Sequence, residues 1–130
     1  MVVSDALADT SVFIAIESGR SLKADAMPGG LAVSIITVGE LRAGVLAADD
    51  LETRDRRLHT LLTALSLNPI PIDERVAEAW ARLRVTLGDS EIRLEINDSW
   101  IAATALAHGL PLVTQDADHI AVPGLEVIHV

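Results

Sequence analysis

The chain contains no cysteine, only three aromatic residues and a single lysine among its 130 residues. Without cysteine, disulfide bonds, thiolate nucleophiles and cysteine-ligated zinc are excluded. Because aromatic side chains are so scarce, the core must be built from Leu, Ile, Val and Ala. No apolar run approaches the roughly 20 residues of a membrane helix, and the N-terminus lacks the basic-then-apolar order of a signal peptide. We therefore expect a cytoplasmic protein without a membrane span.

Basic residues are also few. The chain has 10 basic and 19 acidic residues, which gives a formal net charge of −9. An acidic protein does not attract phosphate backbones through its overall field, so the composition alone disfavours nucleic-acid binding. If the protein acts on RNA, bound cations, an arginine-bearing face or a basic partner must offset this charge locally.

Short apolar segments alternate with longer amphipathic ones along the whole chain, and half of the residues are apolar. This alternation predicts one α/β domain over residues 1–130, with helices flanking a small, mostly parallel sheet. The predicted strands lie within 2–8, 31–36, 110–113 and 125–130, and the predicted helices begin near 12 or cover 37–47, 51–65, 73–87 and 97–108.

Three acidic residues follow predicted strands, and a fourth begins a predicted helix. Asp9 follows the first strand, Glu40 lies one helical turn past the second, and Asp116 follows the third. Asp98 lies at the start of the helix that leads into the third strand. Because function in open parallel sheets collects at the carboxyl ends of the strands, we expect these acids to converge there.

Each acid taken singly has a structural explanation. Thr37 and Glu40 have the spacing of a capping box, in which the glutamate bonds back to the first helical residue. Asp98 suits the positive end of a helix dipole. Asp9 is a good helix N-cap, and Asp116 a good turn residue.

Taken together, the four carboxylates favour a metal site. Acids gathered at one sheet edge repel each other, and a divalent cation relieves that repulsion. Mg²⁺ prefers oxygen ligands and bridges carboxylates to phosphates. Two such ions about 3.5–4 Å apart hold the attacking and leaving oxygens of a phosphoryl displacement. The pattern thus predicts phosphodiester chemistry with Mg²⁺ or Mn²⁺ and an activated water as nucleophile.

Other phosphoryl chemistries lack their usual residues. Receiver domains and haloacid-dehalogenase phosphatases use a lysine near the phosphate, but the only lysine, Lys23, is far from any strand end. A metal-free ribonuclease needs His or Lys as acid and base, and the histidines show no paired spacing. Only His119, just past Asp116, lies near the expected site. An acidic phosphotransfer or phosphatase domain stays as a weaker alternative.

Several of these segments resemble the PIN domain, and more narrowly the VapC toxins of VapBC toxin–antitoxin modules. They are residues 9–11 (Asp-Thr-Ser), 37–44 (Thr-Val-Gly-Glu-Leu-Arg-Ala-Gly), 97–105 (Asn-Asp-Ser-Trp-Ile-Ala-Ala-Thr-Ala), 112–118 (Leu-Val-Thr-Gln-Asp-Ala-Asp) and 123–128 (Pro-Gly-Leu-Glu-Val-Ile). The resemblance implies a PIN-like three-layer sandwich and an endoribonuclease that depends on Mg²⁺ or Mn²⁺.

The resemblance also implies roles for individual residues. It assigns the acidic quartet to Asp9, Glu40, Asp98 and Asp116, and it makes Asp118 a candidate fifth metal ligand. It makes Ser11 and Thr114 supporting hydroxyls, with Thr114 bonded to a carboxylate or to water. Two positions depart from the family pattern: His119 replaces an aromatic residue, and Glu95 adds negative charge before Asp98.

The family's partners follow from the same resemblance. It implies a basic VapB-like antitoxin, an RNA substrate and a homodimer that joins a larger toxin–antitoxin complex. Dimerisation would place arginines such as Arg20, Arg54, Arg56 and Arg57 along an RNA groove, although the run at 54–57 is equally well explained as a solvated helix face. A catalytically silent PIN-fold module that only binds RNA or antitoxin stays as the main alternative.

Overall fold

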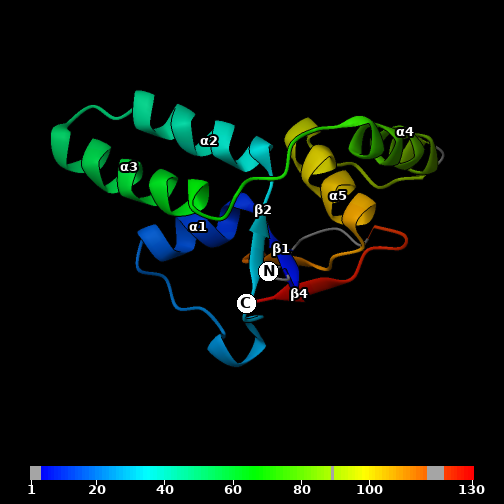
Figure 1. The fold of residues 1–130 in the computed structure, drawn as a ribbon, viewed down its shortest axis with the longest axis horizontal. Helices are drawn as coiled ribbons and strands as arrows, with labels where there is room; N and C mark the ends of the chain where they lie inside the picture. Colours follow the sequence, from blue (N-terminus) through cyan, green and yellow to red (C-terminus); the bar gives the residue numbers. More distant parts are fainter. Residues whose placement is uncertain (1–3, 89, 117–121) are drawn as a thin grey trace.

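The computed structural model describes residues 4–88, 90–116 and 122–130. Four short strands, five α-helices and one 3₁₀ turn follow one another in the described residues, and the strands and α-helices come in the order that the sequence predicts (Figure 1). Their bounds are β1 Ala6–Ala8, α1 Thr10–Glu17, η1 Ala24–Ala26, β2 Leu31–Val33, α2 Ile35–Leu46, α3 Leu51–Leu65, α4 Glu74–Gly88, α5 Ile96–His108, β3 Leu112–Thr114 and β4 Val127–His129.

The four strands form one parallel sheet in the order β2-β1-β3-β4. Leu7 of the central strand β1 pairs with Ala32 on one side and with Leu112 on the other. Both β1 and β3 are buried over their whole length, which explains why they read as continuous apolar runs rather than as alternating ones. The prediction of a small parallel sheet is confirmed.

Helices cover both faces of the sheet, so the molecule has the three layers that the resemblance implies (Figure 1). Alternate strand residues point to opposite faces. Ala6, Ala8 and Val33 pack toward α1, α2 and α3, whereas Leu7 and Ala32 pack toward α5. Helix α4 lies outside α5 and packs against it.

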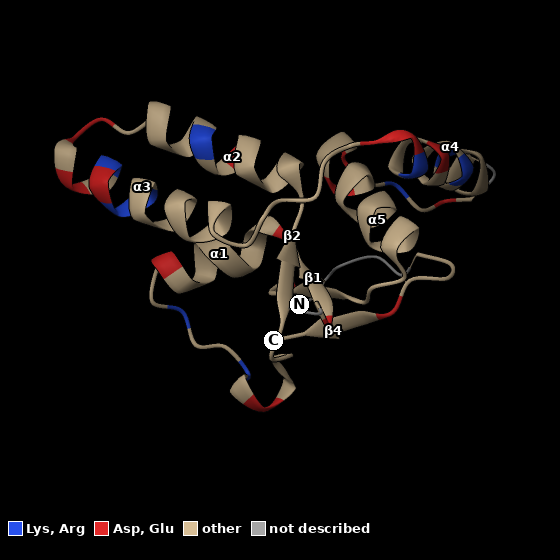
Figure 2. Cartoon of the chain, viewed as in Figure 1, with Lys and Arg blue, Asp and Glu red and all other residues tan. Residues whose placement is uncertain are grey.

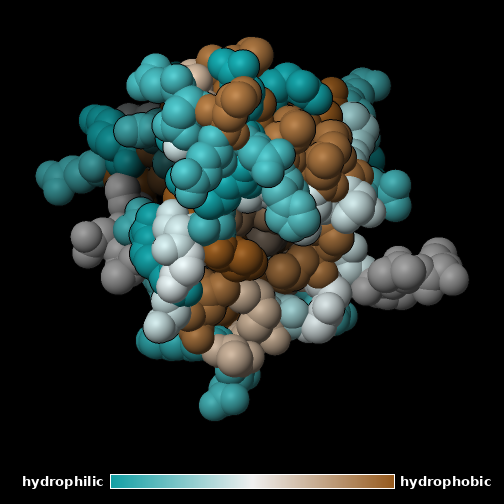
Figure 3. Space-filling model, turned by 90° about the vertical axis from the view of Figure 1, so that its left-hand side faces the viewer, coloured by the Kyte–Doolittle hydropathy of each residue, from teal (hydrophilic) through white to brown (hydrophobic). Residues whose placement is uncertain are grey.

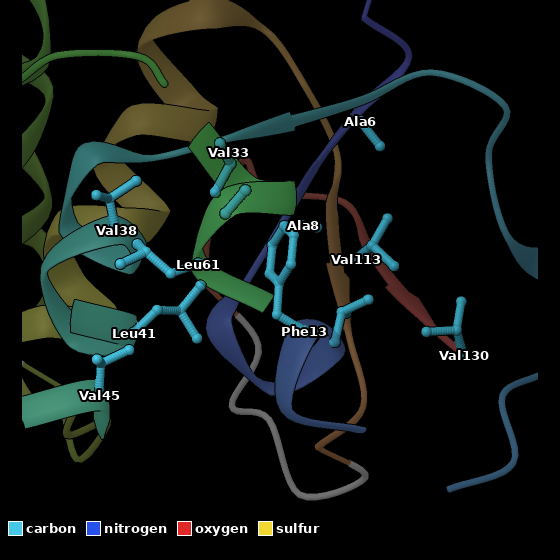
Figure 4. Packing of buried hydrophobic residues seen from close by; sticks show 12 residues of the cluster. Ala6, Ala8, Phe13, Val33, Val38, Leu41, Val45, Leu61, Val113 and Val130 are labelled. Atoms are coloured by element: carbon cyan, nitrogen blue, oxygen red, sulfur yellow. The ribbon is translucent and has the colours of Figure 1, made fainter. Parts of the chain in front are cut away.

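The core on the α1–α3 face combines small strand residues with larger helical ones. Ala6 and Ala8 leave room on the sheet for Phe13 of α1, and Leu61 of α3 packs into the same cluster (Figure 4). Leu61 is fully buried. The scarcity of aromatic residues thus corresponds to an aliphatic core with one phenylalanine in this cluster.

The predicted strand 31–36 is too long, because helix α2 begins at Ile35 rather than at Thr37. The first backbone N–H groups of a helix need partners outside it. Here the Ser34 hydroxyl accepts from Ile36 N–H at 3.0 Å, and the Ile70 carbonyl accepts from Ile35 N–H at 2.9 Å. The capping box predicted from Thr37 and Glu40 is therefore wrong, because Thr37 lies inside the helix.

The other helix ends agree with their sequence signals. Asp73 accepts a hydrogen bond from Val76 N–H at 3.0 Å at the start of α4, and Gly109 ends α5 in the left-handed conformation, with φ 64°. At the start of α3, Thr53 N–H donates to the Asp50 carboxylate and lowers the pKa of that side chain. None of the described helices is long and apolar enough to cross a membrane.

Replacing Leu61 by alanine should lower the free energy of unfolding by about 2–5 kcal/mol, because the change leaves a cavity between α3 and the sheet. Urea denaturation followed by circular dichroism measures the loss. The matched control is Leu62→Ala on the same helix, since Leu62 is 55% exposed. An equal loss in both variants would contradict the described core.

Candidate active site

The carboxyl ends of β1, β2 and β3 meet at one edge of the sheet, and several of the predicted site residues lie along it. Asp9 directly follows β1, and its backbone N–H donates to Val113 O of β3 at 2.9 Å. Asp116 lies two residues past β3. The chain passes from β1 to β2 on one side and later returns to β3 on the other, so Asp9 and Asp116 flank the point where the strand order switches. Ligands of open α/β sheets bind at such switch points.

Asp9 is nearly buried and held in one orientation. Only 8% of its surface is exposed. Its Oδ1 accepts hydrogen bonds from the backbone N–H of Ser11, at 3.0 Å, and from the Ser11 hydroxyl. Asp9 is thus the N-cap of α1, as its structural explanation predicted, and this role fixes the carboxylate at the sheet edge.

Two hydroxyl groups join Asp9 to the segment that carries Asp116. The Ser11 hydroxyl lies 3.3 Å from the Thr114 hydroxyl and accepts from Gln115 N–H at 2.9 Å. The Thr114 hydroxyl in turn accepts from Asp116 N–H at 3.1 Å. Ser11 and Thr114 therefore lie between two of the predicted acids, and Thr114 bonds a backbone amide and a hydroxyl there.

Glu40 has a partner on a different helix from the one predicted. Its Oε1 accepts from the Thr10 hydroxyl at 2.7 Å, and that hydroxyl lies 2.9 Å from the hydroxyl of Thr37. Thr37 is fully buried. Since Thr10 adjoins Asp9, this pair of threonines connects Glu40 to the start of α1.

The two threonines were missed from the sequence as site residues. Thr10 follows an acid at a strand end, and Thr37 lies three residues before Glu40, on the same side of α2. These spacings are the signals that could have identified them.

Asp98 lies in the first turn of α5, as predicted, and is exposed. Helices α2 and α5 contact each other, and their first turns lie at the same edge of the sheet (Figure 1). The preceding Glu95 is the N-cap residue of α5 but makes no side-chain capping bond.

A stack of two tryptophans fixes the first turns of α5 against α4. The rings of Trp80 and Trp100 are parallel within 5°, with their centroids 4.3 Å apart, and the Arg84 guanidinium lies 5.3 Å from the Trp80 ring. Trp80 Nε1–H also donates to the Ser99 hydroxyl at 3.0 Å. Because Ser99 adjoins Asp98, two of the three aromatic residues hold the turn that carries this acid.

The structure does not bring all four acids into one ligand cluster. Among residues 4–88, 90–116 and 122–130, no three Asp, Glu or His side chains form a group that could hold a metal ion. Hydroxyl groups link Asp9 to the Asp116 segment and to Glu40, and Asp98 lies near the same edge of the sheet. Asp118 and His119 lie outside the described residues.

Comparisons with known proteins agree with this fold. The sequence profile of the PIN domain matches residues 6–125. The chain is 52% identical to ribonuclease VapC4 of Mycobacterium tuberculosis over 129 residues, which cover 98% of both chains. The chain belongs to the VapC branch of the PIN-domain family.

Other VapC proteins are similar over nearly their whole length. Ribonuclease VapC5 of Mycobacterium tuberculosis is 46% identical over 125 residues, which cover 94% of this chain and 93% of the relative. The crystal structure of VapBC-5, a toxin–antitoxin system of the same organism, aligns with a TM-score of 0.84 at 40% identity, over 96% of this chain and 98% of that one. The predicted resemblance to VapC and the predicted three-layer fold are confirmed.

Replacing Ser11 by alanine should lower the free energy of unfolding by about 1–3 kcal/mol, because Gln115 N–H and the Asp9 carboxylate each lose a hydrogen-bond partner. Chemical denaturation measures this loss. Ser21→Ala, a change at an exposed serine, should leave stability unchanged. Equal stability of the two variants would show that the Ser11 hydroxyl does not hold the sheet edge together.

Proposed function

We propose that this protein is the toxin of a VapBC-type toxin–antitoxin module and a metal-dependent endoribonuclease. The observation that carries the proposal is the placement of Asp9, Glu40 and Asp116 at the carboxyl edge of three adjacent parallel strands, in a chain of the VapC family. The relatives named ribonuclease give the reaction class. Since the substrate is RNA, we place the protein in the cytoplasm.

The donor atoms at this edge suit a hard cation. The acids offer only carboxylate oxygens, which Mg²⁺ and Mn²⁺ accept. Mg²⁺ in phosphoryl-transfer sites usually binds one or two carboxylates, several waters and the substrate phosphate. A group of three protein ligands in place before substrate arrives is therefore not required. Asp9, Glu40, Asp98 and Asp116 would hold the ion, with Asp118 as an additional candidate ligand.

The bound cation would neutralise phosphate charge and make water more acidic. The protein's own residues then orient the reactants. Ser11 fixes the Asp9 carboxylate, and Thr10 fixes Glu40 through Oε1. As the new P–O bond forms, the proton of the attacking water would pass to a carboxylate oxygen at this edge that does not bind the ion. The P–O bond to the leaving oxygen would break, and that oxygen would take up a proton from solvent.

Asp98→Asn should reduce RNA cleavage in Mg²⁺ by about 100-fold or more, the usual cost of removing a positioned acid–base or ligand group. EDTA should abolish wild-type cleavage, and added Mg²⁺ or Mn²⁺ should restore it. A gel assay with labelled RNA measures both effects.

Asp5→Asn is the matched control for this change. Asp5 bonds Gly30 N–H at 3.1 Å at the opposite edge of the sheet, so its removal should leave cleavage intact. Full RNA cleavage by Asp98→Asn would contradict the assignment of the acidic quartet as the metal site.

A catalytically silent PIN-fold module is the second candidate. It is favoured by the lack, within the described residues, of a three-acid group that could hold a metal ion. It predicts no binding of Mn²⁺ by calorimetry and no growth arrest when the protein is expressed alone. Metal-dependent RNA cleavage by the purified wild type would rule it out.

We propose that a basic, VapB-like antitoxin covers the apolar groove between α1 and α3. The groove has a volume of about 780 Å³, and brown apolar patches surround a hollow on this side of the molecule (Figure 3). Asp55 and Arg56 also line the groove, and an exposed apolar surface rimmed by polar residues is typical of protein interaction sites. The solved VapBC-5 structure is a toxin–antitoxin complex. The apolar wall of the groove includes Ile16, Leu58 and Leu62.

The homodimer expected from the family resemblance remains a prediction.

Leu62→Glu should weaken co-purification with a co-expressed VapB-like antitoxin, because the antitoxin would have to cover a charged side chain and remove its water where Leu62 offers apolar surface. RNA cleavage by the variant alone should be unchanged. Val85→Glu on α4 is the control, since Val85 is also an exposed apolar residue, at 74% against 55% for Leu62, and it lies on the opposite layer. Normal antitoxin binding by Leu62→Glu would place the antitoxin elsewhere.

A further inference from the structure

One arginine reaches from α3 to the helix that carries Glu40. Arg57 Nη1–H donates to Gly44 O of α2 at 2.8 Å, and the side chain is half-buried. Figure 2 shows that α3 bears both signs of charge, whereas the sheet is almost free of charged residues. Arg57 thus brings a positive charge from α3 to the inner side of α2.

Arg57 and Glu40 line the same pocket. The pocket has a volume of about 220 Å³ and lies between α1 and α2. Ile14 and Glu17 lie four and seven residues after Thr10, on the same side of α1, and Gly44 lies one helical turn after Glu40. The pocket therefore extends the acidic edge away from the sheet. Its lining residues are Ile14, Glu17, Glu40, Leu41, Gly44 and Arg57.

Most N–H donors of the Arg57 guanidinium are unused within the described residues. A guanidinium carries five N–H donors, and within the described part of the chain Arg57 makes one hydrogen bond and no salt bridge. Asp50 lies close enough for Arg57 to lower its pKa, but the two are not paired. Glu17 and Glu40 disfavour an anion in this pocket, whereas the unused donors of the half-buried Arg57 attract one.

We infer that Arg57 binds a backbone phosphate of the RNA next to the scissile one, with Ile14 and Leu41 as the apolar wall against the ribose. This inference rests on the proposed ribonuclease function and names the residue that positions its substrate. It also supplies the local cation that a chain of net charge −9 needs in order to hold RNA.

A purely structural role is the competing explanation, in which Arg57 only ties α3 to α2. Arg54 provides the control, because it makes the same kind of bond, from Nη2 to Ala48 O at 3.4 Å, and does not line the pocket. Glutamine at either position keeps an N–H donor for the carbonyl and removes the charge. Comparing R57Q with R54Q therefore separates phosphate binding from the tie between the helices.

The test measures binding of a fluorescent single-stranded oligoribonucleotide by anisotropy in EDTA, over a series of salt concentrations. R57Q should bind roughly 10-fold more weakly or worse, as for loss of a charged hydrogen bond. Its plot of log affinity against log salt should be shallower by about 0.7, the value for one phosphate contact on a single strand. R54Q should match the wild type. In Mg²⁺, R57Q should raise KM far more than it lowers kcat.

A second pair of variants tests the same pocket independently, so that the inference stays testable if R57Q does not fold. Ile14→Asp puts a negative charge into the same pocket at a position that is 40% exposed, and it should also weaken RNA binding. Ile16→Asp on the same helix, 59% exposed and outside this pocket, should not. Circular dichroism and thermal midpoints confirm that each variant is folded.

The outcomes separate the two proposals. Cleavage by the wild type with unchanged affinity and salt slope in R57Q and in Ile14→Asp overturns the role of Arg57 alone. Arg57-dependent binding without any cleavage in Mg²⁺ supports Arg57 and overturns the nuclease. A wild type that neither binds nor cleaves RNA overturns both.

Discussion

The parallel pairing of β1 with β2 on one side and β3 on the other is the constraint on which the site depends. Strands in parallel present their carboxyl ends at one edge, so Asp9 and the Asp116 segment must lie there together. The fully buried residues of β1 and β3 make this alignment hard to shift, since a slip by one residue would turn every side chain to the wrong face. Cores on both faces hold the register.

Hydroxyl groups donate hydrogen bonds to two of the carboxylates. Ser11 bonds Asp9, and Thr10 bonds Glu40, so these two acids have donors that carry no charge. The bonds also fix the directions of the carboxylates before any ligand binds. Carboxylate oxygens held in this way would suit the proposed Mg²⁺ or Mn²⁺, which keeps part of its water shell.

Arginines of α3 hold positive charge in particular places, although the chain as a whole is acidic. The arginines of α3 form hydrogen bonds to backbone carbonyls, as Arg57 does to Gly44 and Arg54 to Ala48. The bond of Arg57 holds its positive charge close to α2 and to the pocket that Glu40 lines, and it leaves other donors of the guanidinium unused. The net charge of −9 therefore does not exclude a local surface that holds RNA, and it favours a basic protein partner.

The sequence by itself determined the fold class, the bounds of α3 and the placement of acids after strands, because periodicity and strand ends are local properties. It did not determine where α2 begins, since Ile35 N–H finds its acceptor on Ile70, far along the chain. Nor did it reveal the bond between Thr10 and Glu40 or the stacking of Trp80 on Trp100. Only the tertiary structure decided these contacts, because each joins elements that approach one another only when the helices pack around the sheet.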